Sequence, residues 1–303
     1  MDFIIYSEHK DLTEGMFGQG LIWLLEILNI LQDQKYIQEN SKIHFNVNSL
    51  PYDNLIPSYI CPRKQYQIHE LNNPITINIK EFKSRHRIDF PFHSSSFDTA
   101  HDIWNKYFSF SEEILQQIPD FDGTCTVGIH YRGTDKNRDL SQANPITHDD
   151  LFLIMDDFLE NNKHIHNIYC CSDEQAIIDK IIEKYSNMSI YNYNQKRSDT
   201  DTEAFFRKGQ NVNKVEQHSM TIAALVDMIA LSKCNTILKT SSALSAFSKI
   251  INPDLNLYAM SAMKQPWFPT GVVKSYTSSS AKVNEILSRT MQGHVYATDE
   301  SLK

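Results

Sequence analysis

The sequence has no cysteine pair at C-x-x-C spacing, and its five cysteines are an odd number. Reduced thiols in a cytoplasmic protein are therefore the expected state. His164 and His166 stand two residues apart, but no further Cys or His pair completes a set of zinc ligands. Basic residues are also in deficit, with 29 Lys and Arg against 37 Asp and Glu. This balance excludes a general nucleic-acid binder, which needs a basic surface, but it leaves room for a local basic pocket.

Signals for export and for membrane insertion are missing as well. The first residues, Met1 to Tyr6, include no basic segment and no cleavage site, so we expect no signal peptide. The most apolar segment, Leu21 to Leu31, has about half the length needed to cross a bilayer, so we expect no transmembrane segment. The 303 residues, 41% of them hydrophobic, suffice for two globular domains of a cytoplasmic protein.

The first half of the chain begins with the pattern of a Rossmann-type unit. Phe3–Tyr6 predicts a short strand, a glycine-rich loop follows over Glu14–Gly20, and Leu21–Asp33 predicts a helix that is buried on most of its surface. The glycines are spaced G-x-x-G-x-G, which differs from the dinucleotide fingerprint G-x-G-x-x-G, so no NAD site is inferred. Two interpretations of Gly18 stay open: it permits a tight turn, or it lets a ligand approach the backbone closely.

The second half alternates strands and helices. Strands are predicted over 124–130, 168–172, 188–191 and 236–239, and helices over 147–160, 173–185, 219–233 and 243–251. Repeated βαβ units predict a parallel sheet with helices on both faces, and hence an α/β fold class. We expect domains over 1–122 and 123–275, divided at the turn cluster Pro119–Gly123, and a helix within 276–303 that crosses back to the first domain.

Polar side chains follow three of the predicted strands directly. His130 and Arg132 end the first of these strands, Asp173 follows the second, and Thr240–Ser242 follow the last. In an open α/β sheet, ligands bind outside the carboxyl ends of the strands, so these groups are candidates for one site. The alternative is that they are solvated strand ends and an ordinary helix N-cap.

These residue types suit a diphosphate. Hydroxyls and free backbone N–H groups at a helix N-terminus, as expected at Thr240–Ser242, form an anion site. The planar guanidinium of Arg132 can make a bidentate phosphate contact, and a departing diphosphate needs such a cation where no metal is bound. Asp227 lies inside an apolar helix. It is either a capping or helix-face carboxylate, or an acceptor for the N1–H and N2–H₂ groups of guanine.

Three motifs resemble those of the GDP-fucose-dependent fucosyltransferases, among them the core α1,6-fucosyltransferases and the rhizobial nodulation enzymes. The motifs follow one another in the same order as in that family. The stretch Gly128-Ile-His130-Tyr-Arg132-Gly-Thr134-Asp135-Lys136 resembles the family motif H-x-R-R-T-D-K. Tyr169–Asp173 is similar to a strand that ends in T-D, and Asp227–Ser242 is similar to the motif D-x-x-x-L-S…T-x-S-S. The resemblance covers about residues 124 to 252, and the first half matches only in its glycine-rich loop.

The resemblance implies a GT-B fold, in which two Rossmann-like domains with parallel sheets face an inter-domain cleft. It implies an inverting, metal-independent glycosyltransferase that moves L-fucose from GDP-fucose to a glycan hydroxyl without a cofactor. By this resemblance His130 and Asp227 would hold guanine, and Arg132 and Ser242 would hold the β-phosphate, with an uncertainty of one position between Ser241 and Ser242. The expected donor-binding residues are His130, Arg132, Asp173, Asp227, Ser241, Ser242 and Gly18.

The catalytic residues implied by the resemblance are Arg132, Asp139 and Lys136. In the relatives a carboxylate follows R-R-T-D-K by a few residues, which indicates Asp139 as the base, with Asp135 as the alternative. The base would take the proton of the acceptor hydroxyl as that oxygen attacks C1. Lys136 would pair with the base or with the phosphates. Gly133 departs from the motif, because it replaces the second arginine.

Three other functions stay open. The loss of the second arginine allows a related transferase that uses another GDP-sugar or another group. A catalytically silent nucleotide-sugar binder could have the same fold. Asp199-Thr200-Asp201 resembles the D-x-D of metal-dependent GT-A enzymes, but it lies in a polar loop instead of following a strand. The expected partners are a nucleotide-sugar donor and a carbohydrate acceptor, without nucleic acid; the acceptor, the linkage and the oligomeric state are not predicted.

Overall fold

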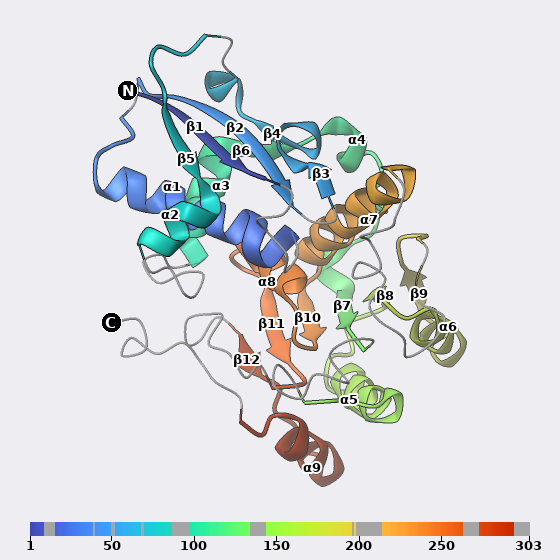
Figure 1. The fold of residues 1–303 in the computed structure, drawn as a ribbon. Helices are drawn as coiled ribbons and strands as arrows, with labels where there is room; N and C mark the ends of the chain where they lie inside the picture. The colour runs from blue at the N-terminus through green and yellow to red at the C-terminus, as the bar shows by residue number, and fades with distance from the viewer. Residues whose placement is uncertain are drawn as a thin grey trace. The chain divides into compact units, whose positions relative to one another are not determined.

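A computed structural model divides the chain into two compact α/β units (Figure 1). The first consists mainly of Met1–Gln117 and Gly209–Leu225, and the second of Ile118–Lys208 and Val226–Ser301. The residues that the structure describes are 1–8, 16–38, 40–49, 52–67, 70–86, 97–133, 144–195, 197, 214–262 and 273–293. In this part of the chain, no helix has both the length and the apolar composition that a membrane crossing requires.

The first unit contains two small sheets. Its strands are β1 (Asp2–Ser7), β2 (Lys42–Ser49), β3 (Tyr52–Asn54), β4 (Ile60–Pro62), β5 (Ile75–Asn78) and β6 (Phe108–Phe110). Its helices are α1 (Trp23–Asp33), α2 (Ile79–Arg85), α3 (Phe97–Tyr107) and α4 (Glu112–Leu115), with π-helical segments at Met16–Ile22 and Leu55–Tyr59 and a 3₁₀ turn at Lys64–Tyr66. The main sheet has the order β3-β2-β1-β5, and β1 is parallel to both of its neighbours, as a Rossmann-type unit requires.

The glycine-rich segment before α1 is helical where the structure describes it. Gly18 lies within the π-helix Met16–Ile22, whereas the sequence predicts a loop there. The buried side chains of Phe17, Leu21 and Ile22 explain the difference, because a helical turn buries them together. Helix α1 itself is confirmed as a mostly buried helix, and even Glu26 on its polar stripe is 0% exposed.

The second unit contains one parallel sheet of six strands. Its strands are β7 (Thr126–Tyr131), β8 (Asn167–Ser172), β9 (Ser189–Tyr191), β10 (Thr236–Lys239), β11 (Asn256–Ala259) and β12 (Lys274–Ser275). Its helices are α5 (His148–Asn161), α6 (Gln175–Lys184), α7 (Lys214–Lys233), α8 (Ala243–Ile251) and α9 (Ala281–Thr290), with a 3₁₀ turn at Gly123–Cys125. The first turns of α7 belong to the first unit. The predicted α/β class is thus confirmed. The sheet of the second unit is parallel, whereas in the main sheet of the first unit β1, β2 and β5 are parallel and β3 pairs antiparallel with β2.

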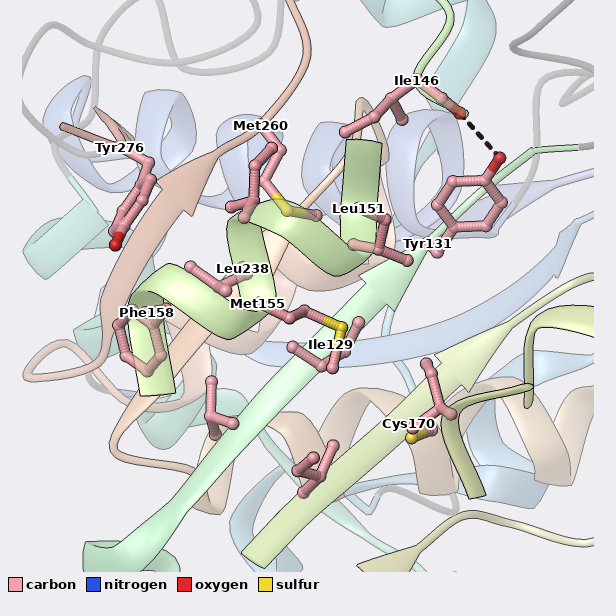
Figure 2. Close-up of a cluster of buried hydrophobic side chains, with 14 of the residues drawn as sticks. Ile129, Tyr131, Ile146, Leu151, Met155, Phe158, Cys170, Leu238, Met260 and Tyr276 are labelled. Carbon is pink, nitrogen blue, oxygen red and sulfur yellow. Dashed lines mark hydrogen bonds between the residues drawn. The ribbon is translucent and has the colours of Figure 1, made fainter. Parts of the chain in front are cut away.

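Helices cover both faces of this sheet. Because side chains alternate along a strand, Ile129 and Gly128 of β7 point to opposite faces. Ile129 belongs to a core that includes Leu151 and Met155 of α5 (Figure 2). Residues of α6 and α9 belong to the same core. A side chain at Gly128 would instead meet Leu231 of α7 within 2.8 Å. The predicted parallel sheet with helices on both faces, a doubly wound arrangement, is therefore present.

Helix α5 begins as its sequence predicts. The side chain of Thr147 accepts a hydrogen bond from the backbone N–H of Asp150, and the Asp150 carboxylate accepts one from Thr147 N, which together form a capping box. Four buried residues of α5, Leu151, Ile154, Met155 and Phe158, face the sheet. Above them the hydroxyl of Tyr131 donates to the carbonyl oxygen of Ile146 over 2.9 Å, which ties the end of β7 to the entry of α5 (Figure 2).

Helix α9 packs on the second unit. That a helix within 276–303 crosses back to the first domain stays a prediction. Val283, Ile286 and Leu287 are buried in the core of the second unit. Arg289 donates to the Asp150 carboxylate of α5 over 2.8 Å, and its side chain is 56% exposed. The apolar stripe of α9 specifies that the helix must be covered, but it does not specify which domain covers it.

Candidate functional site

The order of the strands identifies one edge of the second sheet as a binding edge. The order is β12-β11-β10-β7-β8-β9, so the chain builds outward from β7 in one direction and from β10 in the other. In doubly wound sheets, ligands bind at the carboxyl ends of the two strands where the direction reverses. Arg132 follows β7 and Thr240 follows β10, so both lie at this switch point.

Backbone hydrogen bonds hold these two strand ends together. The N–H of Arg132 donates to Oγ1 of Thr240 over 2.8 Å, and the N–H of Thr240 donates to the carbonyl oxygen of His130 over 2.9 Å. The Arg132 side chain is half-buried. Because Thr240 bonds both to the N–H of Arg132 and to the carbonyl oxygen of His130, the backbone of Arg132 is held beside the Thr240–Ser242 segment.

The end of β8 joins the same group. The N–H of Gly133 donates to Oδ1 of Asp173 over 3.1 Å, and the N–H of Glu174 donates to Oγ of Ser172 over 3.1 Å. The structure therefore brings together the three strand ends that the sequence marks as polar.

Helix α8 presents its N-terminus at this edge. Ser242 is the N-cap, and its hydroxyl accepts a hydrogen bond from the backbone N–H of Leu244 over 3.3 Å. The Ser242 hydroxyl donates to no residue that the structure describes, so its proton can serve a ligand, and Ser241 before it is partly exposed. Since the first N–H groups of a helix lack partners within the helix, this end of α8 suits an anion.

His130 is a buried, neutral group within the site. Its side chain is 4% exposed, and its Nδ1 has no hydrogen-bond partner among the described residues. Burial lowers the pKa of His130 well below 6.5, and the nearby positive charges of Lys239 and Arg132 lower it further. A neutral imidazole can accept a hydrogen bond at one nitrogen and donate one at the other, which suits the edge of a purine base.

Asp227 lies in the middle of α7 with both carboxylate oxygens engaged. Its side chain is 2% exposed; Oδ1 accepts from the Tyr169 hydroxyl over 2.7 Å and Oδ2 accepts from Nε2 of Gln195 over 2.8 Å. Tyr169 belongs to β8, on the sheet face that also carries His130, because its neighbour Cys171 pairs in register with His130. These partners account for the burial of Asp227, and its role toward guanine stays a prediction.

Burial raises the pKa of Asp227 to about 6, although its hydrogen bonds with Tyr169, Cys171 and Gln195 and the charge of Arg197 favour the ionised form. The pKa of Asp227 in the folded protein therefore lies above its unfolded value of 3.8, so protonation of Asp227 stabilises the folded state. This contribution to the free energy of unfolding is complete below pH 3.8 and is lost as the pH rises through about 6. We therefore expect the wild type to gain about 2 kcal/mol of unfolding free energy relative to Asp227→Asn between pH 7 and pH 4. Urea unfolding of both proteins across this range measures the difference, and parallel pH profiles would contradict it.

Glu174 and Tyr131 explain why a glycine stands at position 133. A Cβ atom at Gly133 would lie 2.0 Å from Oε1 of Glu174 and 2.6 Å from Cε1 of Tyr131. Glu174 is 6% exposed, and its Oε2 lies 3.0 Å from Nε2 of His148, within hydrogen-bonding distance. Among the described residues, Oε1 of Glu174 has no hydrogen-bond partner. A side chain at position 133 would therefore have to displace these two groups.

Gly133→Ala should lower the free energy of unfolding by about 1–3 kcal/mol, because the added methyl group has no room beside the Tyr131 ring and the Glu174 carboxylate. In a Glu174→Ala background the same substitution should cost less, because the closest atom has been removed. A double-mutant cycle by urea unfolding measures this coupling. An equal cost in both backgrounds would show that Glu174 does not limit the space at position 133.

Sequence analysis missed the part that Arg197 plays. Its side chain is 7% exposed and donates to the carbonyl oxygens of Ser172 (3.1 Å) and Tyr193 (2.6 Å). It thereby fastens the segment after β9 to the end of β8. An arginine among polar residues gives no signal of such burial, because its partners are backbone carbonyls that any sequence supplies.

Several predicted positions lie outside the described residues. These are Asp135, Lys136 and Asp139 after the first motif, and the tripeptide Asp199–Asp201. Gly18 belongs to the first unit. Within the ranges that the structure describes, no group of three or more His, Cys, Asp or Glu side chains is placed to hold a metal ion.

No protein-family model matches this chain, and a search of curated proteins finds no match. Solved structures do resemble it. NodZ alpha-1,6-fucosyltransferase soaked with GDP-fucose is 12% identical, with a TM-score of 0.48 over 84% of this chain and 94% of NodZ. The similarity is to fucosyltransferases.

Two further structures give the same result. Fucosyltransferase NodZ from Bradyrhizobium is 13% identical, with a TM-score of 0.46 over 84% of this chain and 94% of its own. A mutant of FUT1 from Arabidopsis thaliana in complex with GDP is 8% identical, with a TM-score of 0.47 over 89% of this chain and 71% of its own. At these identities and TM-scores the likeness decides neither the reaction nor the substrate of this chain.

Proposed function

We propose that this chain is an inverting, metal-independent glycosyltransferase that moves L-fucose from GDP-fucose to a hydroxyl of a glycan. The observation that carries the proposal is the fixed position of Arg132 beside the N-terminus of α8, at the switch point of a doubly wound sheet. A guanidinium, free helix N–H groups and serine hydroxyls at one place are the groups that a diphosphate requires.

The same groups account for catalysis without a metal. As the acceptor oxygen bonds to C1 of the sugar, the bond from C1 to the phosphate oxygen breaks and negative charge grows on the diphosphate. Arg132 and the N–H groups before α8, together with the hydroxyls of Ser241 and Ser242, would stabilise that charge. The Ser242 cap and the N–H groups at the start of α8 are held by the fold before the reaction begins, so these groups need little reorganisation in the transition state.

The acceptor proton requires a separate base. Asp139 is the proposed base and Lys136 its proposed partner, both by the resemblance of the first motif. A carboxylate in this position would take the proton as the acceptor oxygen attacks from the side opposite to GDP, which inverts the configuration at C1. Asp139→Asn separates this role from donor binding: it should abolish transfer and preserve GDP affinity, and continued transfer would place the base elsewhere.

A thermal-shift screen tests the choice of nucleotide directly. GDP should raise the unfolding temperature of the native protein, because a ligand bound only by the folded state stabilises it. At equal concentrations UDP and ADP should have smaller effects, since neither base presents the N1–H and N2–H₂ pair that Asp227 and His130 are proposed to recognise. Equal shifts with all three nucleotides would contradict guanine recognition, and no shift with any of them would remove the donor site.

One observation favours a second candidate. Gly133 stands where the family motif has a second arginine, so one expected positive charge is missing near the proposed diphosphate. The buried carboxylate of Glu174 lies beside Gly133 instead. A weaker grip on the leaving group would suit a silent nucleotide-sugar binder or a transferase with another GDP-linked donor. GDP binding without release of GDP from GDP-fucose, across a broad acceptor panel, would favour the silent binder; release from a different GDP-sugar would favour the other donor.

A further inference from the structure

A pocket of about 490 Å³ lies on the second unit, at the opposite end of its sheet from Thr240–Ser242. It is lined by the first residues of β10 and β11, Thr236 and Asn256, which pair in register. The end of α5 and the segment Tyr276–Ser279 after β12 complete the lining. Since the proposed donor site follows the carboxyl ends of the strands, this pocket at their amino ends is separate from it.

The lining is polar without charge. No described residue that lines the pocket is acidic or basic. Amide groups are frequent, and they come from Asn161, Asn162, Asn235 and Asn256. Some of their capacity is used internally: Nδ2 of Asn162 donates to the carbonyl of Phe158 over 2.8 Å, and Oδ1 of Asn235 accepts from Thr236 over 3.0 Å.

Other amide atoms remain for a ligand. The side chain of Asn256 makes no hydrogen bond to any described residue, so it offers two N–H donors and a carbonyl acceptor. The hydroxyls of Thr277 and Ser279 add groups that both donate and accept. Such a set matches a ligand whose own groups both donate and accept.

Aromatic rings form the rest of the lining, and their positions are fixed. Tyr258 and Tyr276 lie with ring centroids 6.0 Å apart at 84°, and Phe158 lies 6.0 Å from Tyr276 (Figure 2). The Tyr276 hydroxyl donates to one oxygen of Asp157 over 2.6 Å, and Ser278 donates to the other over 2.7 Å. Because these contacts already hold the lining side chains in place, a ligand would lose little binding free energy to the ordering of side chains.

The chemistry of the lining narrows the class of ligand. The absence of charge among the described lining residues disfavours phosphates and other ions, which need an opposite charge or a helix N-terminus. The many amides and hydroxyls disfavour a lipid, because burying them unpaired against hydrocarbon is costly. A sugar ring has an apolar C–H face that can lie against a tyrosine ring and hydroxyls that can pair with amides. The volume also falls within the range of small-ligand sites.

We propose that this pocket binds a neutral carbohydrate, with one sugar ring against Tyr258 and its hydroxyls paired with Asn256 and its neighbouring amides. The binding itself does not depend on the transferase activity. If the proposed function holds, the pocket would retain a part of the glycan remote from the hydroxyl that reacts, and so raise the local concentration of the acceptor.

The test uses the full chain on a printed array of neutral and acidic oligosaccharides, followed by calorimetry with the neutral oligosaccharide that is captured best. We expect Tyr258→Ala and Asn256→Ala each to weaken binding by about tenfold or more. Tyr258→Phe keeps the ring and should bind nearly as well as the wild type. Ser279→Trp, at an exposed position on the pocket, should block binding without touching the core.

Controls separate this pocket from the donor site. Arg132→Ala should keep oligosaccharide binding and weaken GDP binding. All pocket variants should unfold at temperatures near that of the wild type. The proposal is overturned if no neutral oligosaccharide binds, if Asn256→Ala and Ser279→Trp both bind as the wild type does, or if Arg132→Ala abolishes binding. A protein that binds the oligosaccharide but does not bind GDP would support the pocket proposal and contradict the donor-site proposal. The two proposals can therefore fail independently.

Discussion

Replacing Arg132 with alanine is expected to lower kcat for fucose transfer by roughly two to three orders of magnitude, as for the loss of one transition-state donor. The backbone N–H of Arg132 donates to Thr240, so the end of β7 should keep its place in the variant. The loss would therefore report on charge stabilisation at the leaving diphosphate. Steady-state kinetics with GDP-fucose and the acceptor measure it.

Two further arginine variants sharpen this result. Arg132→Lys keeps the positive charge but not the planar fork, so it should recover only part of the rate. Arg289→Ala removes an arginine from α9 that is 56% exposed and bonded to Asp150, so it should leave kcat unchanged. Near-normal turnover in Arg132→Ala would remove this residue from the mechanism.

Gly123→Ala is expected to destabilise the second unit by about 3 kcal/mol or more. An added Cβ would lie 1.9 Å from the carbonyl oxygen of Lys233, and that backbone cannot move away as the end of a side chain can. Gly123 lies in the 3₁₀ turn before β7, and Lys233 ends α7 shortly before β10. The close approach of Gly123 and Lys233 therefore helps to fix the relative position of β7 and β10. The carboxyl ends of these two strands lead to Arg132 and Thr240.

The glycine at position 293 provides a control. Nothing lies within 4 Å of a Cβ added there, although its φ of +73° makes alanine mildly unfavourable. Gly293→Ala should cost about 1 kcal/mol, well below the cost at Gly123. Guanidinium unfolding compares the two variants, and equal costs would show that the Lys233 carbonyl is not the obstacle.

The sequence predicts much of the second unit because its signals are local. The capping residues Thr147 and Asp150 mark the start of α5, and the polar residues after β7, β8 and β10 mark one edge of the sheet. Parallel strands place their carboxyl ends together, so order along the chain is enough to predict that Arg132, Asp173 and Ser242 lie near one another. The first unit is less predictable, and the π-helix that contains Gly18 was expected to be a loop.

Positions that depend on a distant neighbour were not predictable. Gly133 reads as a departure from a motif until the Glu174 carboxylate and the Tyr131 ring are seen beside it. Arg197 reads as one charge in a polar loop, although its guanidinium is buried against backbone carbonyls at the end of β8. In both cases one partner, Glu174 for Gly133 and Ser172 for Arg197, lies tens of residues away in the chain and is brought close only by the packing of the sheet.

By itself, the sequence determined the α/β class, the alternation of strands and helices in the second half, and the polar edge that carries His130, Arg132 and Thr240–Ser242. These follow from side-chain periodicity and capping, which act over a few residues. Only the tertiary structure decided that α9 packs on α5, that position 133 has no room for a side chain, and that an uncharged pocket exists at the amino ends of β10 and β11. Each of these three features depends on which surfaces of the protein meet. Hydrophobic burial is non-directional, so the sequence indicates that an apolar surface must be covered but does not specify which surface covers it.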